Sequence, residues 1–189
     1  MIVKDFQYIG DQLFKCSLNN SHSGNLSIRL GNKMYITASG SQLGNLMFND
    51  IVDISVFGGD IKNASRESVV HRAIYEQTKA KAIVHSHPPF ITALSMLIDE
   101  FKPIDAEGKY YFQSIPVLKT ENAIGSEEVA EKIPVYFEKC PIVIVAGHGS
   151  FAIGDSLEEG YQATSSIESS AKILYYNLVY KANYKVDSF

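Results

Sequence analysis

The sequence has few cysteines and no long apolar run. Its two cysteines, Cys16 and Cys140, are far apart and form no Cys-x-x-Cys motif, which is typical of separate thiols in a reducing compartment. No segment reaches the ~18 consecutive apolar residues of a membrane-spanning helix. The first residues also lack the apolar core of a signal peptide. We therefore expect a cytoplasmic protein that has no membrane partner.

The sequence also lacks an excess of basic residues. Seventeen lysines and arginines against 21 acidic residues give a formal net charge of -4, so no basic field is available for a nucleic acid. The hydrophobic content of 46% and the charged content of 20% are ordinary for a globular protein. A length of 189 residues, without an internal repeat or a linker, predicts a single domain over 1–189.

Two patterns in the first third of the chain are typical of β-hairpins. Apolar and polar residues alternate over 25–30, and a Gly-Asn turn joins this segment to a second apolar segment at 34–37. The same signature recurs over 51–57 and 60–62, which two glycines separate. The sequence therefore predicts a sheet that is at least partly antiparallel.

The segments outside these hairpins predict helices on the faces of that sheet. Apolar periodicity and capping residues predict helices over 3–19, 65–79, 90–97, 126–139 and 155–180. We expect Ser65 to be the N-cap of the second helix, and Asp155 with Glu158 to form a capping box on the last. Short apolar runs predict three buried strands, one that starts at Lys81, one over 115–118 and one over 141–146. Residues 99–114 show no clear period, so we expect an ordered loop there.

A His-x-His pair follows one of the predicted buried strands. Successive side chains of a strand point to opposite faces, so His85 and His87 project from the same face, about 7 Å apart along the strand. Pro88 and Pro89 end the strand there, because neither has an amide N–H. Two such imidazoles can bind one metal ion, although a structural role is equally compatible with the pair alone.

Further candidate ligands lie at other chain reversals. His148 stands between Gly147 and Gly149 at the end of a predicted buried strand; the alternative for it is an exposed hairpin position. Glu67 falls in the first turn of a predicted helix, where the helix dipole favours a carboxylate, although acidic residues there often only stabilise the helix. His71, one turn later, is better interpreted as a packed histidine or a support for the site.

A second group of residues is suited to an anion. Glycine stands beside small hydroxyl or amide residues at 23–25 and at 37–41, where backbone N–H groups can point at a phosphate. Ser65, at the start of a predicted helix, adds the positive end of that helix. Each feature is common in turns, but together, beside a candidate metal, they indicate a sugar-phosphate site.

Five short segments occur in an order and spacing that match one known family: 24–29, 36–40, 65–67, 85–87 and 147–149. With this set the sequence resembles the class II aldolase/adducin-domain family over residues from about 5 to 180. The resemblance implies an α/β protein with three α/β/α layers, in which helices flank a central, largely antiparallel mixed sheet. It also implies a homotetramer whose active sites lie between subunits.

The resemblance further assigns roles to individual residues. It implies one Zn²⁺ per subunit held by Glu67, His85, His87 and His148, with Glu67 also acting as the acid/base. It implies phosphate contacts from Gly24, Asn25, Ser39, Gly40 and Ser65. Arg66 stands where the fuculose-phosphate members of the family have a second phosphate-binding serine, so we expect either that a guanidinium holds the phosphate here or that the substrate differs. An acid from the neighbouring subunit aligns near Asp105, Tyr110 or Tyr111.

The activity that the resemblance implies is that of a zinc-dependent aldehyde-lyase. We expect cleavage of a ketose 1-phosphate, such as L-fuculose 1-phosphate, to dihydroxyacetone phosphate and an aldehyde through a zinc-stabilised enediolate, because a Lewis acid at the C2 oxygen accepts the electrons of the breaking bond. The alternatives are another sugar-phosphate reaction on the same scaffold, namely methylthioribulose-1-phosphate dehydration or pentulose-5-phosphate epimerisation, and a non-catalytic adducin-like module.

Overall fold

A mixed β-sheet forms the middle layer of the protein, seen in a computed structural model that describes residues 2–184. Its strands are β1 (Asn25–Leu30), β2 (Lys33–Thr37), β3 (Ile51–Ser55), β4 (Ala82–Ser86), β5 (Glu100–Phe101), β6 (Ile115–Leu118), β7 (Ile142–Val145) and β8 (Gly149–Gly154). They lie in the order β3-β2-β1-β4-β8-β7-β6-β5. Among these described strands only β6 and β7 pair in parallel, so the expectation of a largely antiparallel mixed sheet is confirmed.

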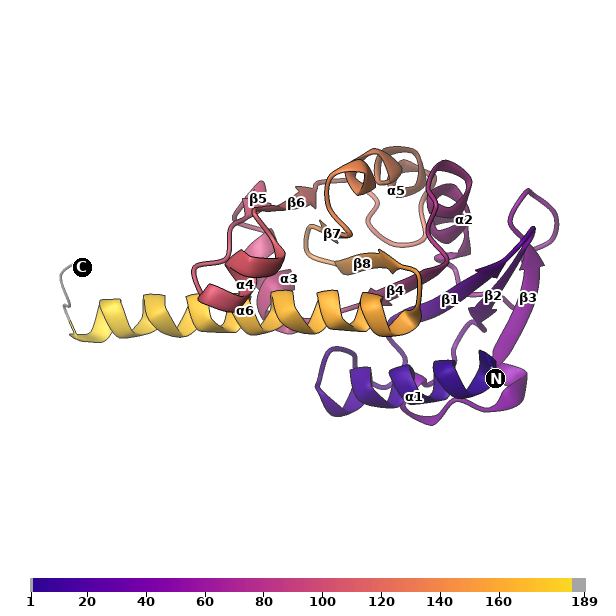
Figure 1. Cartoon of the computed structure of the whole chain (residues 1–189), viewed down its shortest axis with the longest axis horizontal. Coiled ribbons are helices and arrows are strands. Elements are labelled where there is room, and N and C mark those ends of the chain that lie inside the picture. Colours follow the sequence, from indigo (N-terminus) through magenta and orange to yellow (C-terminus); the bar gives the residue numbers. More distant parts are fainter. Residues whose placement is uncertain (1, 185–189) are drawn as a thin grey trace.

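Helices cover both faces of the sheet, which confirms the three-layer arrangement (Figure 1). The helices are α1 (Ile2–Lys15), η1 (Leu43–Asn45), η2 (Phe48–Asp50), α2 (Ser68–Gln77), α3 (Pro89–Ser95), α4 (Ala106–Tyr111), α5 (Glu127–Lys132), η3 (Pro134–Glu138) and α6 (Leu157–Tyr184). Apolar residues of α2, α5 and η3 pack on one face, and those of α1, α3 and α6 on the other. None of the described helices is both long enough and apolar enough to cross a membrane.

The position of β4 in the sheet determines where its histidines point. All five residues of β4 are buried, and it lies between β1 and β8. Ile83 packs in the core beside α2, whereas Ala82 and Val84 pack in the core beside α1. Because side chains alternate along a strand, His85 lies on the same face as Ile83, at the end of the strand. The sheet therefore presents His85 on its α2 face.

The prediction of a second hairpin is wrong for its second strand. Residues 60–62 form no strand, and β3 pairs with β2 instead. The guanidinium of Arg72 on α2 donates hydrogen bonds to the carbonyl oxygens of Ser55, Gly58 and Gly59. This side chain holds the segment after β3 as a loop against α2, so the loop cannot turn back as a strand.

Two helix starts differ from the prediction. Ser65 is not the N-cap of α2, because Glu67 occupies that position and Ser65 Oγ accepts a hydrogen bond from the Glu67 N–H (3.3 Å). The predicted capping box of α6 is shifted by one residue. Ser156 Oγ accepts from the Glu159 N–H and the Glu159 carboxylate accepts from the Asp155 N–H, so Glu158 takes no part.

Three further segments depart from the predicted helices and loops. Helix α1 ends at Lys15, although Leu18 beyond it stays buried in the core. The helix predicted over 126–139 is split into α5 and η3, since Pro134 has no N–H to donate to the carbonyl at position 130. The predicted loop over 99–114 contains β5 and α4, which are too short to show a hydrophobic period.

Candidate metal centre

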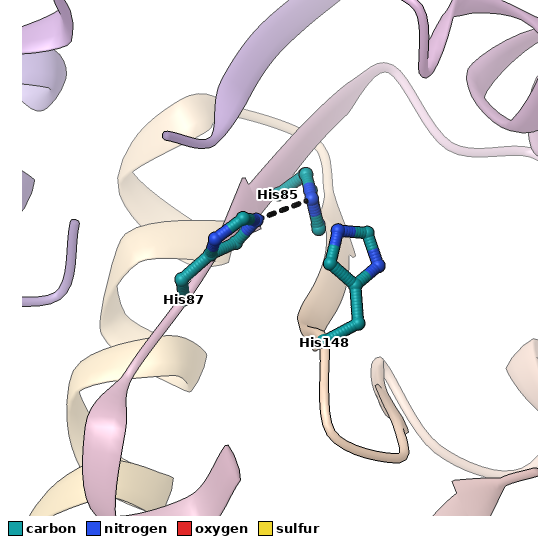
Figure 2. A group of neighbouring side chains, drawn as sticks. All are labelled: His85, His87 and His148. Atoms are coloured by element: carbon teal, nitrogen blue, oxygen red, sulfur yellow. Dashed lines mark hydrogen bonds between the residues drawn. The ribbon is translucent and has the colours of Figure 1, made fainter. Parts of the chain in front are cut away.

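Three histidines from two strand ends converge on one point (Figure 2). His85 is on β4, His87 directly follows β4, and His148 lies in the turn between β7 and β8. One ring nitrogen from each lies within 4.8 Å of the other two, and the Nε2 atoms of His85 and His87 are 3.0 Å apart. The expectation that His85 and His87 share a face therefore agrees with the geometry.

Two glycines allow His148 to approach the other two histidines. Gly147 has a φ of +68°, which a residue with a side chain rarely adopts. At Gly149 a Cβ atom would lie 2.2 Å from the Ser86 carbonyl oxygen and 2.9 Å from Cδ2 of His87. Only glycine therefore lets β8 begin directly against the end of β4, beside the His87 ring.

The orientation of the His85 ring is held by two neighbours. Its Nδ1–H donates to the carbonyl oxygen of Ser150 (3.0 Å), because a carbonyl can only accept. The ring of Phe151 stacks on it at 4.1 Å between centroids and 17° between planes. With the proton on Nδ1, the Nε2 atom of His85 has a free lone pair that points at the other imidazoles, which is the arrangement of a metal-binding histidine.

Burial keeps the three rings neutral. It lowers the pKa of His85 well below its usual range, with the nearby His87 and His148 rings adding to the effect. Burial and then the charge of His148 lower the pKa of His87 to about 4, and burial also lowers the pKa of His148. A neutral imidazole is the form that coordinates a metal, so the three side chains are ready ligands at neutral pH.

Glu67 lies beside the three histidines, but it is not one of the residues whose ligand atoms all lie within 4.8 Å of one another. Its Oε1 accepts the N–H of Gly125 (2.8 Å) and lies 3.7 Å from Nε2 of His148. Its Oε2 is buried and has no hydrogen-bond partner among the described residues. Burial raises the pKa of Glu67 to about 7, although the Gly125 N–H acts against this shift. Three neutral imidazoles beside an unpartnered carboxylate oxygen form a donor set that fits a divalent cation.

All ten site residues predicted from the sequence line one cavity of about 340 Å³. They are Gly24, Asn25, Ser39, Gly40, Ser65, Arg66, Glu67, His85, His87 and His148. Of the other lining residues, Ser23, Ala38 and Ser41 lie within the segments 23–25 and 37–41 that the sequence indicated as suited to an anion. The remaining two, His22 and Ile124, were not predicted as site residues.

Two of the loops that line the cavity are held together by backbone hydrogen bonds. The Ser39 N–H donates to the Asn63 carbonyl (2.9 Å), and the Ser65 N–H donates to the Thr37 carbonyl (3.1 Å). These bonds place the segments 37–41 and 65–67 side by side at the cavity. Arg66 is exposed there and forms no ion pair with a described residue, which leaves its guanidinium available for an anion.

Other candidates from the sequence lie away from the cavity. His71 is packed in the core, as expected, and Asp105 caps α4 by accepting the N–H of Gly108 (2.8 Å). Tyr110 and Tyr111 lie on α4 and are exposed. None of these four residues lines the cavity of its own chain.

Residues 4–175 match the family described as Class II Aldolase and Adducin N-terminal domain, and the chain belongs to this family. It is 31% identical over 180 residues to an L-fuculose phosphate aldolase of Methanocaldococcus jannaschii, covering 94% of this chain and 98% of the relative. It is 30% identical to a 3-oxo-tetronate 4-phosphate decarboxylase of Haemophilus influenzae, covering 95% and 90% of the two chains. The crystal structure of an L-fuculose-1-phosphate aldolase from Thermus thermophilus superposes with a TM-score of 0.93 at 32% identity, over 100% and 98% of the two chains.

Proposed function

We propose that the chain is a single-domain, zinc-dependent class II aldolase that cleaves a ketose 1-phosphate, such as L-fuculose 1-phosphate, to dihydroxyacetone phosphate and an aldehyde. The observation that carries the proposal is the convergence of His85, His87 and His148 beside Glu67 in a cavity that the segments 23–25 and 38–41 also line. The relatives named as L-fuculose phosphate aldolases support the substrate class.

The three histidines and Glu67 would hold the cation. Nitrogen donors favour Zn²⁺ over Mg²⁺ or Ca²⁺, which prefer oxygen. A bound Zn²⁺ supplies Lewis-acid polarisation of the substrate's C2 carbonyl oxygen. The Ser150 carbonyl and the stacked Phe151 ring fix the orientation of His85 for this role.

Glu67 is the residue that moves the proton. When the C3–C4 bond breaks, the C4 hydroxyl gives up its proton as C4 becomes the aldehyde, and the acid/base group of the neighbouring subunit would accept it. C3 takes up the electron pair of the broken bond and must be protonated to give dihydroxyacetone phosphate. Glu67, displaced from the cation or adjacent to it, would donate and accept that proton, because burial favours the protonated form of its carboxyl group and so raises its pKa. In the condensation direction the same carboxylate removes the proton from C3.

The other predicted residues of the cavity would position the substrate. Backbone and side-chain donors of Gly24, Asn25, Ser39, Gly40 and Ser65 would bind the phosphate, and Arg66 would neutralise part of its charge. Holding the phosphate orients C2 and C3 toward the histidines and Glu67, which converts binding energy into orientation.

We further propose a homotetramer in which a neighbouring subunit completes the site. An apolar groove of about 390 Å³ runs between α3 and α6, with exposed Leu97 and Leu178 on its walls. The acid of the neighbouring subunit would come from the region of Asp105, Tyr110 and Tyr111, none of which lines its own cavity.

Two measurements test the function. Purified protein is expected to contain about one Zn²⁺ per chain, and a panel of ketose 1-phosphates and pentulose phosphates with added Zn²⁺ is expected to yield dihydroxyacetone phosphate from at least one ketose 1-phosphate. Zinc-loaded, folded protein that releases none from any member of the panel would contradict the aldolase proposal.

A second reaction on the same scaffold is a candidate because of the decarboxylase relative, which covers as much of the chain as the aldolase relative does. The same panel, extended by a phosphorylated 3-oxo acid as a decarboxylase substrate, separates the products. A decarboxylase releases CO₂ from that acid, a methylthioribulose-phosphate dehydratase releases water, and an epimerase changes a stereocentre with no cleavage. An adducin-like module that is not an enzyme would turn over none of them.

A further inference from the structure

A carboxylate of α6 binds the start of the neighbouring helix α3. Glu168 is only 8% exposed, and its Oε1 and Oε2 atoms accept the backbone N–H groups of Phe90 (2.9 Å) and Ile91 (3.0 Å). The residue does not line the cavity, and the proposed chemistry gives it no role. A buried carboxylate is costly unless it is well bonded, so its position calls for an explanation.

The start of α3 depends on this carboxylate for its hydrogen bonds. The first amides of a helix have no partner within the helix. Here the N-cap is Pro88, which has no side-chain hydrogen bond to offer, and Pro89 has no N–H. The Thr92 N–H donates to the Pro88 carbonyl (3.1 Å). Only the two amides between Pro89 and Thr92 are left, and Glu168 accepts both.

This helix start directly follows the candidate ligand His87. The last residue of β4 that pairs with β8 is Ser86, so His87 lies just outside the sheet. Its backbone N–H donates to the Leu18 carbonyl and the Asn19 Oδ1 (2.9 and 2.8 Å). Its ring Nδ1 has no hydrogen-bond partner in the described part of the chain, unlike that of His85. The position of the His87 ring therefore depends on how the backbone is held on either side of it.

We propose that Glu168 is a positioning residue for the metal centre, whose carboxylate holds the start of α3 and thereby keeps His87 directed at the metal. This inference rests on the proposed function, because it requires that His87 bind a metal. A carboxylate is suited to the role because its two oxygens match two successive N–H groups at the positive end of a helix. A glutamine offers only one acceptor and turns its NH₂ group toward the second N–H.

The test compares Glu168→Gln with the matched control Thr164→Val. Thr164 lies one turn earlier on α6, is fully buried and has a hydroxyl without a hydrogen-bond partner among the described residues. The affinity for Zn²⁺ and Co²⁺ is measured by competition with a chelating dye, and the geometry by the visible spectrum of bound Co²⁺. We expect Glu168→Gln to weaken metal binding by ~10-fold or more and to shift the Co²⁺ bands. We expect Thr164→Val to bind like the wild type.

Hydrogen exchange gives a local measure of the same change. The amides of Phe90 and Ile91 are expected to exchange faster in Glu168→Gln. If they do while metal affinity and the Co²⁺ spectrum stay at wild-type values, Glu168 only caps α3 and the inference is wrong. If Glu168→Gln does not fold, Glu168→Asp replaces it, with both oxygens kept but withdrawn by one methylene, and the same criteria apply. A wild-type protein that binds neither metal contradicts the proposed function itself.

Discussion

Histidines are buried in two regions of this molecule, and the two regions differ in what surrounds the rings. His85, His87 and His148 converge at the cavity, whereas His71 lies between α2 and the sheet. Burial lowers the pKa of His71 to about 3, a shift of the same direction as in the cluster. Phe151 lies against both regions, stacked on His85 and edge-on to His71.

The difference lies in the partners of the ring nitrogens. Nδ1 of His71 bonds to Ser27 Oγ (2.7 Å), which in turn bonds to Tyr75 OH (2.8 Å), so this nitrogen is part of a polar chain in the core. Nε2 of His71 is buried and has no hydrogen-bond partner among the described residues. The other three rings direct nitrogen atoms at one another across a space that opens into the cavity. A strongly lowered pKa therefore does not by itself mark a metal ligand; convergence on a shared, accessible point does.

The largest expected effect separates the two regions directly. His87→Ala should remove the bound Zn²⁺ and lower turnover by ~10³-fold or more, because the Lewis acid is lost with its ligand. His71→Gln should keep about one Zn²⁺ per chain. Metal analysis after dialysis, together with the dihydroxyacetone phosphate assay, measures both. Full metal content in His87→Ala would remove His87 from the centre, and loss of metal in His71→Gln would mean that His71 also supports metal binding.

Glu67 is expected to show an effect on proton transfer and little on the fold. Glu67→Gln keeps the shape and the acceptor for the Gly125 N–H, but it cannot exchange a proton near neutral pH. Turnover should fall by ~10² or more while the thermal unfolding transition stays near that of the wild type. Steady-state kinetics with the best substrate of the panel supply the measurement. Near-normal turnover would assign the proton to another group.

Arg66 is expected to affect binding more than turnover. Arg66→Ser should raise KM for the phosphorylated substrate by ~10-fold with a small change in kcat, because a charge-assisted contact to the phosphate is lost. The inhibition constant of inorganic phosphate should rise by a similar factor. Lys62→Ser, which removes an exposed cation outside the cavity, is the control and should change neither. An equal effect of both variants would mean that only overall charge matters.

The sequence predicted the elements whose side chains carry a clear pattern. The alternation over β1, the apolar runs of β4 and β7 and the glycines around His148 were sufficient to place three histidines near strand ends. They could not show that β4 lies between β1 and β8, because strand order depends on contacts between distant segments. That order brings His148 next to β4.

Other features were missed because they depend on long-range contacts or on very short segments. The loop over 58–62 depends on Arg72, a residue of the following helix. The unusual cap of α3 comes from Glu168, 77 residues beyond Ile91, and no local spacing could indicate it. The six-residue helix α4 is shorter than two turns, so it shows no period.

The smallest expected effect concerns His71 and the pH dependence of stability. The pKa of His71 is about 3 in the folded protein, against an ordinary value of 6.5, because burial disfavours the charged ring. Below pH 6.5 the unfolded chain therefore takes up a proton that the folded chain does not. The free energy of unfolding therefore decreases as the pH falls, by about 1.4 kcal/mol per pH unit from this one group.

His71→Gln removes this term. At pH 7 the variant should be about 1 kcal/mol less stable than the wild type, because its bond to Ser27 is weakened. Between pH 6 and pH 4.5 the difference in free energy of unfolding between the wild type and the variant should shrink and then change sign. Urea unfolding of the chelator-treated protein at several pH values measures this free energy of unfolding. The control Ser27→Ala loses the hydrogen bond to His71 but keeps the imidazole, so its free energy of unfolding should change with pH in parallel with that of the wild type. A parallel curve for His71→Gln would mean that this ring takes up a proton as readily in the folded chain as in the unfolded one.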